Sequence, residues 1–472
     1  MRATEDIRYP AYLHQYAQIG YLSALLSSYG VSSPPLEQAV VLELGCAYGT
    51  NLLVMAEAHP EARFIGFDID LEAIEEAQSV AQEAKLTNVE FVASSNMLES
   101  LKHHTFDYIL AHGLFSWVSD EVKEEILQLC QTTLSRDGVG YINYNCNPGW
   151  LNASSIRELF INDIKNVKGA ERIDRFRDKL SSFKGALQNV SDNKKAKAYL
   201  QREVELLEER NDGFLAGEMF SEHNDPFYIS EFCQWLDEYE LEYLGDANPA
   251  LHIQVDPPKE VQILIGECSG NVIKQLQTID FLEHRKFRSS LVRKKRSPSA
   301  IKKESPEKNS TYKLHSPLKR MVKHGDRIEI TLMDEKVIRA PHFSAPFFSQ
   351  FESSHIASTG DTFQTLTRAQ KPDFEHLLLT LLSSHFIIPS SDSERWSPIC
   401  EKRPQISLLN RVFHKKYGFI YNANKRSVSP PNLRSLQYMD GRHTTEEIAQ
   451  ATKTSKENVH ETILLLNQHQ IY

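Results

Sequence analysis

Residues 40–51 read VVLELGCAYGTN, an apolar run that leads into a turn of small residues and then into a helix. A second apolar run, residues 64–67, ends directly before an acidic residue, Asp68. A strand, a tight turn that opens a helix and an acidic residue at the end of the next strand together form a nucleoside-binding crevice. The pattern therefore predicts an α/β fold with a nucleoside site at the carboxyl edge of a parallel sheet.

The residues of the turn indicate which kind of nucleoside cofactor fits. A dinucleotide-binding turn carries three glycines in the pattern G-x-G-x-x-G, and its backbone amides close on a pyrophosphate. In this chain those positions hold Gly45, Ala47 and Thr50, so two of the three glycines are missing. We therefore expect a nucleoside ligand without phosphate.

The chain alternates strand and helix patterns in its first third, which predicts a parallel sheet with crossover helices. The helix after the second strand has a plausible N-cap in Asp70. A long charged helical segment follows residue 150, and the sheet pattern then resumes with a helix at 229–239. The predicted strands are residues 40–44, 63–67, 89–93, 106–111, 138–144, 241–244 and 287–292. We expect a Rossmann-like sheet interrupted by a helical insertion.

The predicted domains follow from these patterns and from changes in composition. Residues 1–150 form the first part of the core and 151–224 a helical insertion with a regulatory or dimerisation role. Residues 225–292 complete the core and include a regulatory region. Residues 293–312 have the composition of a basic, solvated linker. Residues 313–472 form a C-terminal α+β domain.

Two helices near the end of the chain begin at capping residues, Thr444 and Ser455. Two short helices in this order are typical of a winged-helix fold. A DNA-reading helix presents basic and amide side chains to the major groove, whereas here Lys456 and Asn458 stand beside Glu457 and Glu461. The pattern favours interaction or scaffolding over nucleic-acid binding.

The bulk composition limits the classes of function. The net charge of -10 argues against general affinity for nucleic acid or anionic membranes. The six cysteines are scattered without metal-ligand spacing, which is typical of reduced thiols in a cytoplasmic protein. The scattered histidines lack metal-ligand spacing as well, so we expect no bound metal. No apolar run approaches the length of a membrane span, so we expect no membrane insertion.

Candidate cofactor contacts follow the ends of the first three strands. Gly45 and Gly49 let the backbone approach a ligand, and Glu43 can meet an amino group or orient the turn. Asp68 can accept both ribose hydroxyls, although it could also simply cap the next helix. After the third strand, Asn96 and Met97 can contact an adenine ring, or they can form an ordinary polar turn.

Candidate contacts for a second ligand, a substrate that we call the acceptor, follow the fourth and fifth strands. His112 could act as an acid or base, or equally as a structural hydrogen-bond donor. Tyr144 and Asn145 end the fifth strand and can offer oxygens to an acceptor, although Tyr144 could instead pack beneath the insertion. Trp117 can line the part of the pocket that would hold an alkyl chain of the acceptor. The fourth strand lacks the Asn/Asp-Pro-Pro-aromatic loop of enzymes that methylate exocyclic amines of bases.

Several segments together resemble one bacterial family, the class I S-adenosylmethionine (SAM) methyltransferases that carry a methyltransferase regulatory domain. The segments are residues 9–10 (YP), 42–46 (LELGC), 106–113 (FDYILAHG), 116–117 (SW), 144–145 (YN), 148–150 (PGW), 224–228 (NDPFY), 243–247 (YLGDA) and 280–285 (DFLEHR). The family includes enzymes similar to lysine methyltransferases of outer-membrane proteins. The resemblance therefore implies SAM as cofactor and a protein lysine as methyl acceptor, with an outer-membrane protein as a candidate partner.

The positions of residues after the predicted strands give a set of candidate site residues. Tyr9 and Tyr12 are expected to close over the cofactor. The cofactor-binding candidates are Glu43, Gly45, Cys46, Ala47, Gly49, Asn51, Asp68, Ile69, Ser95, Asn96, Met97, Ala111 and His112, and the catalytic candidates are His112, Trp117, Tyr144 and Asn145. A homodimer through 151–224 is a further expectation. A small-molecule methyltransferase, a non-catalytic SAM-binding interaction protein and a nucleic-acid-binding regulator remain as alternatives.

Overall fold

The computed structural model describes residues 13–167, 169–189, 194–252, 256–296, 310–316, 318–354, 356–390, 405–417, 420–421, 427–428 and 434–468. Tyr9, Tyr12 and most of the predicted linker lie outside these residues. The linker's two ends are described, and they belong to strands rather than to a linker.

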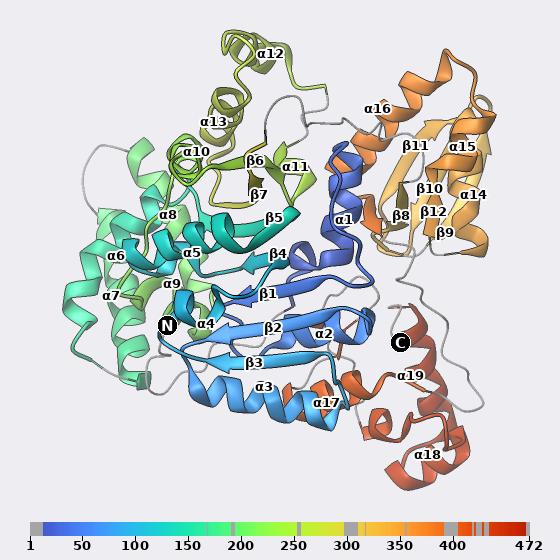
Figure 1. Ribbon diagram of the computed structural model, residues 1–472, viewed down its shortest axis with the longest axis horizontal. Coiled ribbons are helices and arrows are strands. Elements are labelled where there is room, and N and C mark those ends of the chain that lie inside the picture. Colours follow the sequence, from blue (N-terminus) through green and yellow to red (C-terminus); the bar gives the residue numbers. More distant parts are fainter. Residues whose placement is uncertain are drawn as a thin grey trace.

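A seven-stranded sheet forms the centre of the protein (Figure 1). Its strands follow the order β3-β2-β1-β4-β5-β7-β6, and β7 runs antiparallel to both of its neighbours. The strands are β1 (Val40–Leu44), β2 (Arg63–Asp68), β3 (Val89–Ala93), β4 (Phe106–Ala111), β5 (Leu134–Asn145), β6 (Leu241–Asp246) and β7 (Phe287–Lys294). This architecture confirms the predicted α/β class.

The sequence placed six of the seven strands within two residues at each end. β6 and β7 each continue two residues beyond the predicted end, and β5 begins at Leu134 rather than at 138. Leu134 pairs with Phe106, and the register then shifts before Tyr108 pairs with Val139. The irregularity hides the start of β5 from a search for continuous alternation.

Helices cover both faces of the sheet. On one face α1 (Ile19–Ser28), α2 (Thr50–Ala58) and α3 (Leu71–Glu83) share a hydrophobic core with the strands. On the other face α4 (Met97–Leu101), α5 (Asp120–Thr133) and α10 (Ile229–Glu238) build a second core. Two short 3-10 helices, η1 (Gln15–Ala17) and η2 (Phe115–Trp117), precede α1 and follow β4.

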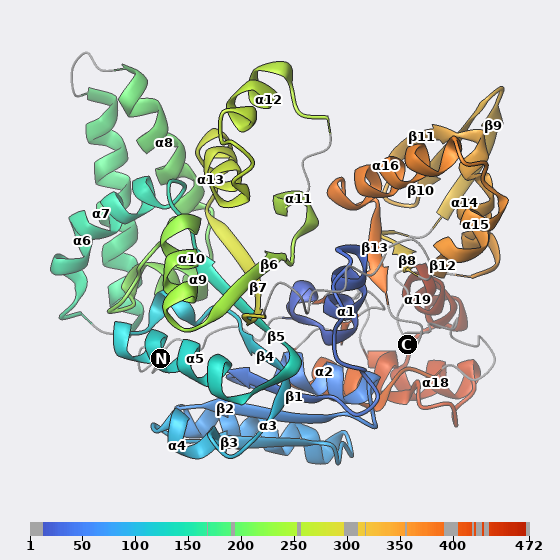
Figure 2. The same ribbon diagram turned by 45° about the horizontal axis from the view of Figure 1, so that its top comes forward.

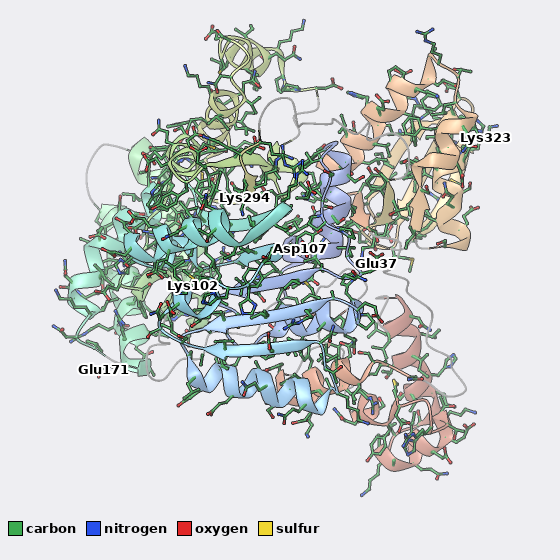
Figure 3. All side chains as sticks on the ribbon, in the orientation of Figure 1. Glu37, Lys102, Asp107, Glu171, Lys294 and Lys323 are labelled. Atoms are coloured by element: carbon green, nitrogen blue, oxygen red, sulfur yellow. The ribbon has the colours of Figure 1, made fainter. Side chains whose placement is uncertain are left out.

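The amino edge of the sheet is fixed by Asp107, which is labelled in Figure 3. Its Oδ2 accepts the Val40 backbone N–H at 3.0 Å, and its Oδ1 accepts the Ser135 hydroxyl at 2.7 Å. One carboxylate on β4 therefore aligns the starts of β1 and β5. The opposite, carboxyl edge is left for the ligand, as in other open α/β sheets.

The helical insertion has a hydrophobic core of its own. It consists of α6 (Leu151–Ile164), α7 (Gly169–Asn189), α8 (Lys194–Glu208) and α9 (Asp212–Phe220). Trp117 and Trp150 join this core from the loops after β4 and β5. Three further helices, α11 (Pro249–His252), α12 (Lys259–Gly266) and α13 (Val272–Glu283), lie between β6 and β7 in sequence.

The C-terminal part contains two three-stranded sheets, β11-β10-β9 and β12-β8-β13, with helices packed on them. This α+β composition confirms the prediction. Its elements are β8 (Thr311–Leu314), β9 (Leu318–His324), β10 (Arg327–Leu332), β11 (Val337–Pro341), η4 (His342–Ser344), α14 (Ala345–Ser353), β12 (Ile356–Ser358), α15 (Thr359–Thr365), α16 (Gln370–Ser383) and β13 (Ile387–Ser390).

A small helical unit follows. It comprises α17 (Leu408–Tyr417), the hairpin β14 (Ile420–Tyr421) and β15 (Ser427–Val428), η5 (Arg434–Tyr438), α18 (Thr445–Thr452) and α19 (Lys456–Gln468). Thr444 forms a capping box at α18, and the Ser455 hydroxyl accepts the Asn458 N–H at the start of α19. Both predicted caps are therefore confirmed.

The C-terminal part packs directly on the face of the central sheet that carries α2 and α3 (Figure 2). Leu409, Phe413 and Tyr421 are buried in the core that contains α2 and α3, and the Tyr421 hydroxyl hydrogen-bonds to Glu57. Among the described residues, no helix combines the length and the apolar character needed to cross a bilayer.

Candidate active site

The turn after β1 has an unusual backbone that only small residues adopt easily. Gly45, Ala47 and Gly49 all have positive φ, at 68°, 45° and 64°. The N–H groups of Gly45 and Cys46 both donate to the Phe67 carbonyl, at 2.8 and 3.2 Å. A Cβ at Gly49 would lie 2.3 Å from Cε1 of Phe91, so the turn passes too close to β3 for any side chain.

Asp68 holds this turn in place from the end of β2. Its Oδ2 accepts the Ala47 N–H at 2.8 Å, and its Oδ1 accepts the Asp70 N–H at 3.0 Å. The helix cap is Asp70, whose side chain accepts the Ala73 N–H. Each Asp68 oxygen keeps a further lone pair, so the carboxylate can still receive two ribose hydroxyls. Ile69, half exposed beside it, offers an apolar surface for a base.

A chain of buried polar groups runs from β1 to the segment before α1. Asn51 donates from Nδ2 to Oε1 of Glu43 at 3.1 Å, and its Oδ1 accepts the side-chain amide of Gln18. Oε2 of Glu43 and Oε1 of Gln18 are buried and have no hydrogen-bond partner among the described residues. Burial also raises the pKa of Glu43 to about 8.

Two buried oxygens without partners, at the two ends of one hydrogen-bonded chain, are costly unless a ligand pairs with them. An ammonium group has three N–H donors and a positive charge, which suits both oxygens. The residues present therefore fit the amino-acid end of SAM. Glu43 and Asn51 were expected here from the sequence, whereas Gln18 was not.

Of the residues expected around adenine in the loop after β3, two are exposed and one is buried. Ser95 and Asn96 are exposed at the carboxyl edge of the sheet. Asn96 caps α4 with its Oδ1, which accepts the Glu99 N–H at 3.1 Å, and its amide nitrogen remains for a ligand. Met97 is 5% exposed and packs in the core shared by α4 and α5. A Met97 contact with adenine therefore stays a prediction that the packing does not favour.

Two histidine rings stack at the end of β4. Ala111 is buried in the last position of the strand, and the His112 ring lies 3.4 Å from the His14 ring, centroid to centroid, at 23°. Nδ1 of His112 is 2.8 Å from the Tyr141 hydroxyl. Burial lowers the pKa of His14 to about 4 and that of His112 well below its usual range. Both rings are therefore neutral at pH 7.

The structure does not bring the remaining catalytic candidates to this crevice. Tyr144 is 1% exposed, and its ring stacks on Phe232 with centroids 4.4 Å apart. Side chains alternate across a strand, so Tyr144 faces the α5 and α10 core while Tyr141 and Asn143 face the other side. Tyr144 is therefore a packing residue, but it packs against α5 and α10 and not beneath the insertion, as the alternative had it.

Asn145 and Trp117 also have structural partners. The Asn145 side chain donates to Oδ1 of Asn224 at 3.0 Å, and its backbone N–H donates to the Ser116 hydroxyl at 2.9 Å. Trp117 meets Trp150 edge to face at 6.0 Å, within the core of the insertion. Both link the sheet to the insertion, and their expected contacts with an acceptor remain predictions.

Sequence reasoning missed His14, Gln18, Tyr141 and Asn143. The side chain of Asn143 accepts the Gly113 N–H at 3.3 Å and donates to Ser289 at 3.2 Å. The period-two alternation along β5 could have separated Tyr141 and Asn143 from Tyr144. No local pattern points to His14 or Gln18, because they reach the site from a different segment of the chain.

Comparisons with known proteins agree with this architecture. Residues 36–205 match the model of a methyltransferase domain, and residues 211–294 match that of a predicted methyltransferase regulatory domain. The Rickettsia prowazekii protein RP028 is 30% identical over 235 residues, which cover 49% of this chain and 92% of RP028. The chain belongs to the SAM-dependent methyltransferases that carry this regulatory domain. Its cofactor is SAM, as the resemblance implies and as the turn, which favours a nucleoside without phosphate, allows.

Two further relatives extend the comparison. RP789 of the same organism is 32% identical over 292 residues, or 61% of this chain, and the match spans about half of RP789, 52%. The solved structure of PKMT2 from Rickettsia typhi in complex with AdoHcy superposes with a TM-score of 0.80, at 22% identity over 98% of this chain and 99% of PKMT2. The likeness to PKMT2 covers the whole fold, including the C-terminal part.

Proposed function

We propose that this methyltransferase transfers the methyl group of SAM to lysine side chains of a protein, with an outer-membrane protein as the substrate class. The observation that carries the proposal is the fold shared with PKMT2 over nearly the full length of both chains. The resemblance of the sequence to lysine methyltransferases of outer-membrane proteins supports the same acceptor. A shared C-terminal domain supports a large acceptor, because such a domain adds surface beyond a small-molecule pocket.

In this proposal the cofactor-binding residues divide by the part of SAM that they hold. Asp68 receives the ribose hydroxyls, while Ile69, Ser95 and Asn96 surround the adenine. Glu43, Asn51 and Gln18 receive the amino group. The backbone of Gly45, Cys46, Ala47, Gly49 and Ala111 borders the methionine part. SAM supplies a sulfonium methyl group, an electrophile that an amine lone pair can displace.

The acceptor lysine must lose a proton before it reacts. Its unperturbed pKa lies about 3.4 units above pH 7, so exposing the lone pair costs about 4.6 kcal/mol. The stacked rings of His14 and His112 are neutral and poorly hydrated, so an ammonium group beside them loses water without gaining a counter-charge. Such desolvation lowers the pKa of the lysine and recovers part of that cost.

The helical insertion, residues 151–224, is the proposed dimerisation segment. Its inner face is filled by its own core, yet Leu159 on α6 is 51% exposed and Tyr199 on α8 is 65% exposed. Light scattering on the purified protein would show a dimer, and Leu159→Glu should shift it to a monomer. A wild-type monomer at micromolar concentration would remove this part of the proposal.

The function is tested with methyl-labelled SAM and an unfolded bacterial outer-membrane protein fraction, followed by acid hydrolysis and amino-acid analysis. We expect the label in methylated lysines, and we expect Asp68→Ala to abolish it at low SAM. Label only in the low-mass fraction would favour a small-molecule acceptor. Full SAM binding without any transfer would favour a non-catalytic SAM-binding protein.

A further inference from the structure

We propose that Nε2 of His112 accepts a hydrogen bond from the methyl-accepting amine, and that Tyr141 is a positioning residue that keeps this nitrogen unprotonated. The inference rests on the proposed function, because it requires an amine as acceptor. It goes beyond that function by naming the atom that orients the amine. Neither the sequence pattern nor the two matched domains assign this role.

The hydrogen bonds around Tyr141 fix the tautomer of His112. The Tyr141 hydroxyl donates its only proton to Oγ of Ser289 at 3.2 Å. It can therefore only accept at Nδ1 of His112, 2.8 Å away, so Nδ1 carries the ring proton. In a neutral imidazole the other nitrogen is then a bare acceptor. Within the described part of the chain, no group hydrogen-bonds to Nε2 of His112.

His112 stands where the cofactor and the acceptor meet. It directly follows Ala111, which is paired in register with Leu44, the residue before the cofactor turn. The Gly45 Cα lies under the Leu114 side chain, since a Cβ there would be 3.2 Å from Leu114 Cδ1. The loop after β4 therefore borders the cofactor turn, and the His112 ring lies at this border.

The surroundings keep His112 neutral over the working pH range. His14, from the segment before η1, covers one face of its ring, and a charge on either ring would repel a charge on the other. Tyr141 faces its Nδ1 from β5. Glu43 on β1, Tyr16 on η1 and Asp246 on β6 are the further titratable groups around Tyr141. Asp246 is itself engaged by Arg288 on β7.

A neutral acceptor suits this reaction better than a carboxylate. A carboxylate would stabilise the lysine ammonium and keep its lone pair protonated, whereas a neutral nitrogen orients an N–H of the amine and raises the amine pKa much less, because it carries no charge. Once the ammonium has released one proton to solvent, the lone pair forms the new N–C bond. The C–S bond of the sulfonium breaks, its electron pair stays on sulfur, and the second N–H proton leaves to solvent when the product amine equilibrates.

Three variants of His112 separate this role from packing. His112→Phe keeps a ring against His14 but removes Nε2, His112→Asn keeps a neutral acceptor, and His112→Asp places a charge there. We expect His112→Phe to lower kcat about tenfold or more with an unchanged Kd for SAM. We expect His112→Asn to recover much of that loss, and His112→Asp to move the pH–rate profile to higher pH. Equal losses in all three, or full kcat in His112→Phe, would overturn the inference.

A second measurement does not depend on activity. In protein labelled with ¹⁵N-histidine, the ring signal that disappears in His112→Phe should show a protonated Nδ1 and a bare Nε2 from pH 6 to 9. Tyr141→Phe should weaken this preference. A protonated Nε2 in the wild type would refute the proposal whatever the substrate is. Wild-type protein that yields no methyl-lysine but shows the expected tautomer would count against the lysine function alone.

Discussion

The backbone N–H of Ala47 donates to Oδ2 of Asp68 at 2.8 Å, and this bond ties the turn after β1 to the end of β2. The turn needs the bond because Ala47 has a positive φ of 45°, which costs a residue with a Cβ about 1 kcal/mol. One carboxylate therefore shapes the turn, and in the proposed function it also receives the ribose of SAM.

The first prediction concerns this carboxylate. Asp68→Ala should weaken SAM binding about 10- to 100-fold, because hydrogen bonds to a charged group contribute about 1.5–3 kcal/mol. Isothermal titration measures the change. Asp70→Ala is the matched control, since Asp70 only caps α3. It should lower the free energy of unfolding by about 1 kcal/mol and leave the affinity for SAM unchanged.

The second prediction concerns the protonation of Glu43. Its pKa of about 8 means that the free protein holds a proton there at pH 7, while an ammonium ligand favours the carboxylate. SAM binding should release close to one proton at pH 7, and Kd should fall about tenfold per unit between pH 6 and 8. Titrations in buffers of different ionisation enthalpy report the release. Persistent release in Glu43→Gln would assign it to another group.

The third prediction concerns Gly49, whose missing side chain lets β3 approach the turn. Gly49→Ala should cost about 2–4 kcal/mol of stability and abolish SAM binding, because the new methyl group meets Phe91 and the backbone φ is positive. Gly113→Ala shares the positive φ but opens onto free space, so it should cost only about 1 kcal/mol. Urea unfolding compares them, and equal costs would show that the contact with Phe91 relaxes.

The fourth prediction concerns stability in acid. His14 has a pKa of about 4 in the folded protein and 6.5 when unfolded, so below pH 6.5 only the unfolded state takes up the proton. The stability that this histidine contributes is complete above pH 6.5 and is lost as the pH falls towards 4, by at most about 3 kcal/mol.

Wild-type protein should therefore lose more stability between pH 7 and 5 than His14→Phe, which keeps the stack but cannot titrate. Glu43 and Asp246 have raised pKa values and act in the opposite direction, but they are common to both proteins. Urea unfolding at both pH values gives the difference. Identical losses in the two proteins would mean that His14 is hydrated in the native state.

The sequence alone sufficed to predict the proposed cofactor half of the site. The strand, turn and helix of residues 40–51 are adjacent in the chain, and Asp68 follows at the end of the next strand, so local periodicity and turn chemistry sufficed to predict the crevice and to exclude a pyrophosphate. The helix caps at Asp70, Thr444 and Ser455 were equally local, because a cap and the N–H that it receives lie within three residues.

Only the tertiary structure points to the residues of the proposed acceptor half. Tyr144 and Tyr141 look alike in the sequence, but they point to opposite faces of β5. Tyr144 is buried in the core with α5 and α10, whereas the Tyr141 hydroxyl lies beside His112. Gln18 and His14 reach the site because α1 packs on the sheet, which places them beside Asn51 and His112. The physical reason is that strand register and the burial of apolar surface decide which side chains become neighbours across a sheet. Both depend on segments far apart in the chain, so a local stretch of sequence does not predict them.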